Sequence, residues 1–168
     1  MISPDYCLEM ARYNQWQNNG LRKIVKAMSD EDLRADRGAF FGSILRTLNH
    51  VMWGDILWLA RFDPDAQLPE LADKGGVEQT ANASAWSSER FRVDGQIVEW
   101  ARGVTSLDLS GNIRWTSKTY KTDFDQSKAL CITHFFNHQT HHRGQVHAML
   151  TAAGQTLIDT DLVLMPET

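Results

Sequence analysis

The sequence predicts an all-α protein: a four-helix bundle with a long crossover connection between the second and third helices and a short irregular or hairpin excursion between the third and fourth. Two observations predict this class. Apolar side chains recur at intervals of three and four residues in four long stretches, and proline and glycine gather between the second and third of them. A length of 168 residues with 42% hydrophobic and 23% charged side chains indicates one folded domain over residues 1–168.

The first helix is expected from Asp5 to Met28, where the apolar residues follow the spacing of one helix face. Pro4 suits the first turn, because the backbone N–H that proline lacks would have no partner there. The polar run 29–32 breaks the pattern, and a connection is expected from there as far as Phe41.

The second helix is expected to begin after Ser43 and to stop at Asp63, because the residue before a proline is disfavoured in helical backbone. Residues 63–82 contain two prolines and two glycines and show no sustained period, which is typical of a long connection. Either Asn82 or Ser84 can cap the third helix that follows.

Between Leu107 and Phe124, aromatic and aliphatic residues stand among Thr, Ser and Lys, which predicts the hairpin or irregular excursion. Two strands alone would need to pack against helices in order to persist. The fourth helix is expected after Asp125, as its N-cap, and to end at Gly154. The tail, residues 155–168, is expected to pack along the bundle.

Charge and hydropathy exclude several classes of partner. The chain has 17 Lys and Arg against 21 Asp and Glu, a net charge of −4, and so offers no basic field for nucleic acid. No apolar run is as long as the stretch of about 18 residues that a membrane-spanning helix needs. The first residues lack the basic start and apolar stretch of a secretory signal. We therefore expect a cytoplasmic protein with no nucleic-acid or membrane partner. Its two cysteines, Cys7 and Cys131, are expected to be buried thiols.

The histidines indicate where the chemistry lies. On a helix wheel, one stripe of the fourth helix holds five polar residues: His134, His138, His141, His142 and Gln145. Two histidines four residues apart on one helix face can bind the same divalent ion. The pair His134 and His138 and the pair His138 and His142 both have this spacing, so the spacing alone does not choose between them.

A third ligand must come from another helix, because two ligands seldom hold an ion alone. His50 lies in the middle of the second helix, where it interrupts an apolar row. An unpaired imidazole in such a position is costly to bury, and a metal ion at the bundle centre would satisfy it. The alternative is a hydrogen-bonded or exposed histidine with no metal.

Four ordered segments resemble the DinB family of four-helix proteins, including its YfiT-like branch. The first is Tyr13-Asn14-Gln15-Trp16, followed by Asn18 or Asn19. The second runs from Ala35-Asp36-Arg37-Gly38 through Phe41-Gly42-Ser43-Ile44 to Thr47-Leu48-Asn49-His50 and continues in Trp53, Asp55, Trp58, Leu59 and Arg61. The third is His138 with His141-His142-Arg143-Gly144-Gln145, and the fourth is Asp159-Thr160-Asp161-Leu162. The resemblance spans nearly the whole chain.

The resemblance implies a metal site, because the ligands of that family fall here on His50, His138 and His142. Three neutral nitrogen ligands leave a divalent ion with open positions, which is the arrangement of a catalytic site. The all-imidazole set is expected to hold zinc or nickel, with iron, copper and manganese as alternatives.

The other polar residues of these segments are then candidates for a second layer of residues around the metal ligands or for the substrate pocket. His134 and His141 are extra to the ligand set, and His141 is either a surface histidine or a contact for water or substrate at the metal. Asn14 and Gln145 are candidates for orienting the ligands, since a ligating imidazole usually bonds a further group through its other nitrogen. Asn14 can equally cross-link two helices.

The resemblance also implies chemistry on small molecules. The expected function is metal-dependent transfer of a low-molecular-weight thiol of the bacillithiol or mycothiol type, in which the bound thiol loses its proton and attacks an electrophile. The alternatives are a metal-dependent hydrolase and a stress-related metal-binding protein without turnover. The resemblance further implies a homodimer.

Overall fold

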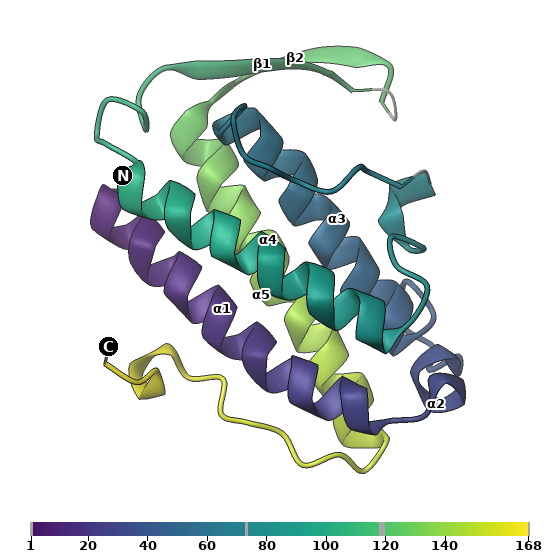
Figure 1. Ribbon diagram of the computed structural model, residues 1–168. Coiled ribbons are helices and arrows are strands. Elements are labelled where there is room, and N and C mark those ends of the chain that lie inside the picture. Colours follow the sequence, from purple (N-terminus) through teal and green to yellow (C-terminus); the bar gives the residue numbers. More distant parts are fainter. Residues whose placement is uncertain (1, 73, 118–119, 168) are drawn as a thin grey trace.

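The computed structural model describes residues 2–72, 74–117 and 120–167, and its fold is mostly helical (Figure 1). Its main elements along the chain are α1 (Pro4–Ala27), α2 (Asp30–Arg34), α3 (Ile44–Phe62), α4 (Ala83–Gly103), β1 (Asn112–Ser117), β2 (Thr122–Ser127) and α5 (Lys128–Ala152). The long helices lie where the apolar periodicity predicts them. The strictly all-α class is too narrow, because β1 and β2 form a two-stranded antiparallel sheet between α4 and α5.

Polar caps set the ends of the long helices. The side chains of Ser3 and Ser43 accept hydrogen bonds from the first turns of α1 and α3. Of the two candidates for the cap of α4, it is Asn82 that accepts, from a backbone N–H at 2.9 Å. Gly154 follows α5 with a φ of +74°, the left-handed conformation that glycine adopts after a helix.

A short helix, α2, lies within the segment expected to be a connection. Ser29 caps it through the backbone N–H of Asp32, and Leu33 anchors it in the core with 1% of its surface exposed. Five residues are too few to show an apolar period. The sequence pattern therefore could not reveal this helix.

The prediction that Asp125 caps the last helix is wrong. Asp125 lies in β2, and its carboxylate accepts hydrogen bonds across the sheet from Asn112 at 2.6 Å and from Arg114 at 2.7 Å. These partners hold the residue in the strand, and α5 begins only at Lys128, after an N-cap residue that makes no side-chain cap bond.

The core lies between two helix pairs, because α1 packs mainly against α4 and α3 mainly against α5. It consists of fully buried aliphatic and aromatic side chains, among them Ile44, Leu45, Met52, Ile56, Trp86, Val93, Ile97, Phe135, Phe136 and Val146. Cys7 and Cys131 are free and buried, as predicted. No helix in the described part of the chain is both long and apolar enough to cross a membrane.

Three connections complete the surroundings of the helices. The crossover after α3 carries a short 3₁₀ segment, η1 (Lys74–Gly76), which packs against α3. The hairpin packs against the end of α3, with the Trp115 ring 5.3 Å from the Trp58 ring. The C-terminal segment runs back along α1 in Figure 1, where Ile158 lies so close to Gly20 that no Cβ would fit there.

Candidate metal site

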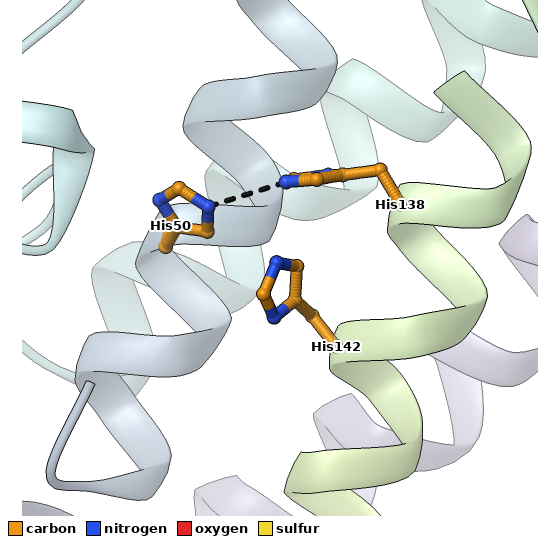
Figure 2. Close-up of side chains that lie close together, drawn as sticks. All are labelled: His50, His138 and His142. Atoms are coloured by element: carbon orange, nitrogen blue, oxygen red, sulfur yellow. Dashed lines mark hydrogen bonds between the residues drawn. The ribbon is translucent and has the colours of Figure 1, made fainter. Parts of the chain in front are cut away.

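Two neighbouring helices bring three histidines together. His50 lies on α3, and His138 and His142 lie one turn apart on α5, which packs against α3. Figure 2 shows the three imidazoles turned toward one another, and each offers a nitrogen within 4.8 Å of the others. The Nε2 atoms of His50 and His138 are 3.2 Å apart. This group of side chains could hold a metal ion.

Hydrogen bonds to the outer nitrogens orient two of the rings. Nδ1 of His50 donates to the carbonyl oxygen of Gly75 at 2.8 Å, and Nδ1 of His142 donates to Oε1 of Gln145 at 2.7 Å. With the proton on Nδ1, each ring keeps the lone pair of Nε2 free for a metal. Gln145 thus lies where a residue that orients a ligand is expected, and η1 supplies a second such partner that the sequence did not indicate.

Burial keeps the three imidazoles neutral. It lowers the pKa of His138 to about 3, with further lowering by the nearby His142 and His50. Burial also lowers the pKa of His50 and of His142, although the hydrogen bonds to Gly75 and Gln145 oppose the shift. Because only the neutral imidazole binds a metal, the site is in its ligand form at neutral pH.

Gly54, on α3, makes room for His138. A Cβ built on Gly54 would lie 2.7 Å from Cε1 of the His138 ring, closer than real carbon atoms approach. The sequence patterns did not reveal the role of Gly54. The signal that could have found it is a glycine one helical turn after His50, in the interior of an apolar helix, where glycine is unfavourable unless something packs closely against it.

Aromatic side chains border the histidines on both sides. The Phe41 ring lies 4.0 Å from the His50 ring, centre to centre, and the Trp53 ring stacks on His50 from 5.9 Å. On the opposite side His134 stands between His138 and Trp58, at 5.7 and 5.4 Å. Aromatic rings therefore lie next to the histidines at both ends of the cluster.

Two further histidines, His134 and His141, lie at the rim of the cluster of three. Both His134 and His141 are exposed, and the His141 ring is 4.8 Å from the His142 ring. Nε2 of His141 accepts a hydrogen bond from Gln145 at 3.3 Å. A chain of contacts thus joins His142 to an exposed imidazole through one amide.

Asn14 lies elsewhere, in a buried ionic network between the helices. Its side-chain amide donates to Asp94 at 3.0 Å, and its oxygen accepts from Arg143. Within this network Arg90 bridges Asp55 at 2.6 Å and Asp94 at 2.9 Å, and all three side chains are at most 1% exposed. Asn14 therefore cross-links helices, which was the alternative considered for it. The pairing of Arg90 with Asp55 depends on the packing of α3 against α4.

Comparison with known proteins finds similar folds and sequences over more than nine-tenths of this chain. The crystal structure of a DinB-like protein from Bacillus cereus ATCC 10987 superposes with a TM-score of 0.69 over 92% of this chain and 95% of that one, at 17% sequence identity. Protein DinB of Bacillus subtilis (strain 168) is 26% identical over 166 residues, which cover 94% of this chain and 91% of that protein. The sequence profile of the DinB family matches residues 1–168. The chain thus belongs to the DinB family.

Proposed function

We propose that this protein is a metal-dependent enzyme in which His50, His138 and His142 hold one divalent transition metal, zinc or nickel. The observation that carries the proposal is the meeting of three neutral imidazole nitrogens within 4.8 Å of one another. The donor set fits such an ion, because hydrogen bonds at Nδ1 of two of the rings place the proton there and leave their Nε2 atoms unprotonated.

The number of ligands favours catalysis over a purely structural role. Structural zinc sites in proteins use four protein ligands, whereas catalytic sites use three and keep a position open. Among the described residues the group contains three side chains, and two of them, His50 and His138, are only half-buried. When bound, the ion would acidify a thiol or water molecule at its open position and polarise a substrate.

The preferred reaction is transfer of a low-molecular-weight thiol to an electrophile. The aromatic rings of Phe41, Trp53 and Trp58 offer apolar surface against which an electrophile can be held. His134 lies beside His138 and is only partly covered by the protein. This partial burial lowers its pKa, so that its neutral ring can accept the proton that the thiol loses. The thiolate sulfur then forms a bond to carbon as the leaving group departs.

Measuring the bound metal tests the proposed metal site, and an assay of thiol conjugation tests the proposed reaction. The protein is purified without a histidine tag and its metal is measured by elemental analysis, for the wild type, His50→Ala and His142→Ala. His147→Ala is the matched control, because this histidine lies on α5 outside the cluster of three. We expect about one equivalent of metal in the wild type and the control and its loss in the other two.

Thiol conjugation to chlorodinitrobenzene is then followed in the same four proteins. Activity that needs the metal and disappears with His50→Ala supports the thiol transferase. Turnover of an ester without any thiol would support a metal-dependent hydrolase instead. Metal binding without either activity on a broad panel of substrates would leave a non-catalytic metal-binding protein.

A further inference from the structure

A cavity lies between α1, α5 and the C-terminal segment, and none of the three clustered histidines lines it. Its volume is about 300 Å³, at the lower end of the range for small-molecule sites. Leu21 and Ile24 of α1 and Leu157 and Ile158 of the C-terminal segment give it an apolar wall, and α5 contributes Arg143 and His147. None of the described residues that line it is acidic.

Hydrogen bonds from α1 hold the C-terminal segment in place over this cavity. The Tyr13 hydroxyl donates to the carbonyl oxygen of Thr160 at 2.6 Å, and the Gln17 amide donates to that of Asp159 at 2.9 Å. Between these anchors and the end of α5, Ile158 sits against Gly20, where a Cβ would overlap its side chain. The cavity is thus a formed feature of the fold.

Arg143 brings to the cavity a buried charge that forms no ion pair with a carboxylate among the described residues. The residue is 7% exposed and lines the cavity. Among the described residues it has no ion pair with a carboxylate, and its hydrogen bond goes to the amide oxygen of Asn14. The two carboxylates of the neighbouring network, Asp55 and Asp94, are both engaged by Arg90.

The unusual feature of Arg143 is how few of its N–H donors have a hydrogen-bond acceptor among the described residues. A guanidinium has five N–H donors in a planar fork that matches a carboxylate, and a buried charge is normally paired. Among the described residues the guanidinium has one hydrogen-bond acceptor, Asn14, and it lies over the Tyr13 ring, 5.4 Å from the ring centre, at the edge of a cavity with an apolar wall. His147 can supply a further donor from the next turn of α5.

We propose that this cavity binds a small organic carboxylate, with Arg143 holding the carboxylate group and the apolar wall holding an aryl or short alkyl group. The Arg–carboxylate pair would be charge-assisted and bidentate in a site largely removed from water, where such pairs are strongest. The site is separate from the cluster of three histidines, because Arg143 faces α1 through Asn14 whereas His142 faces α3.

Phenylacetate is a suitable probe, and isothermal titration calorimetry of the full chain measures its binding. Phenylacetamide has the same shape without the charge, and acetate has the charge without the ring. We expect phenylacetate to bind with a stoichiometry of one and both analogues to bind at least about tenfold more weakly, since each lacks one half of the recognition.

Two kinds of variant locate the binding. Arg143→Lys keeps the charge but loses the fork, and Arg143→Met loses both. Gly144→Leu keeps Arg143 and places a side chain in the cavity, because Gly144 lines it and a Cβ there meets nothing within 4 Å. Gly95→Leu on α4 is the matched control, a helical glycine with equally open surroundings away from the cavity.

We expect binding to weaken about tenfold or more in Arg143→Lys and Gly144→Leu and to be unchanged in Gly95→Leu. If Arg143→Met does not fold, the other two variants still decide the matter. Absence of saturable binding up to millimolar concentrations, or equal binding in Gly144→Leu, would overturn the proposal. Binding should also persist in His50→Ala; its loss there would assign the ligand to the histidine cluster and overturn the second site.

Discussion

The His138 imidazole lies directly against Gly54 of the facing helix. The Cε1 atom of the ring would be 2.7 Å from a Cβ at that position, so the position of the ring depends on the absence of a side chain. The Nε2 atom of His138 also lies 3.2 Å from that of His50. A glycine on one helix thus permits the approach of a proposed ligand on the other.

Gly54→Ala should weaken metal binding. The added methyl group pushes the His138 ring away from the position it needs, and we expect a loss of affinity of about tenfold or more, similar to the loss of other groups that orient ligands. Competition with a chromogenic chelator measures it. Gly95→Ala is the control, because nothing lies within 4 Å of its Cβ; it should bind metal as the wild type does. Equal affinities in the two variants would show that His138 does not depend on Gly54.

Gln145→Leu should also weaken metal binding, for a different reason. The leucine has nearly the same size but cannot accept the Nδ1–H of His142, so the ring loses its orientation and basicity as a ligand. The expected loss is about 10–100-fold. Gln145→Glu keeps an acceptor oxygen and should retain most of the affinity. If Gln145→Leu bound metal as tightly as wild type, the hydrogen bond would have no part in the site.

The long helices could be predicted from sequence because apolar side chains recur along each at intervals of three and four residues, and caps such as Asn82 mark where they begin. Local sequence patterns failed to predict the structure where a side chain's partner is distant in the sequence or where the helix is short. Asp125 has the side chain of a good N-cap, but Arg114 on the facing strand determines its place. The five residues of α2 are too few for a period.

For the site, spacing on α5 left two histidine pairs open, and the resemblance to the DinB family selected His138 with His142. The structure places these two with His50. Gly54 was not found, because the reason for a glycine lies on another helix. The pairing of Arg90 with Asp55, 35 residues earlier, is hidden from sequence for the same reason.

Arg90→Met should strongly destabilise the fold. Asp55 and Asp94 are at most 1% exposed and would lose the guanidinium that bridges them, and removing one partner of a buried pair costs about 3–5 kcal/mol. Urea denaturation measures the free energy of unfolding. Arg92→Met removes an arginine two positions away whose side chain is 64% exposed and pairs with Glu89, and it should cost less than about 1 kcal/mol. A similar cost for both variants would contradict a stabilising role for the buried network.

The stability of the protein freed of metal by a chelator should fall as the pH is lowered below about 6.5. Burial lowers the pKa of His138 from 6.5 to about 3, so between these values the unfolded chain binds a proton that the folded chain does not. The stability that the neutral ring contributes is therefore present above pH 6.5 and is lost progressively toward the lower value.

The variant His138→Gln isolates this effect, because it cannot titrate. Asp94 acts in the opposite direction: burial raises its pKa from 3.8 to about 6, so its contribution is present at low pH and is lost as the pH rises through that window. Because both proteins contain Asp94, its influence cancels in their difference. Free energies of unfolding measured in urea at a series of pH values should fall more steeply with acidification for the wild type than for His138→Gln. Parallel curves would mean that His138 is protonated as readily in the folded chain as in the unfolded one, and that its ring is not desolvated against α3.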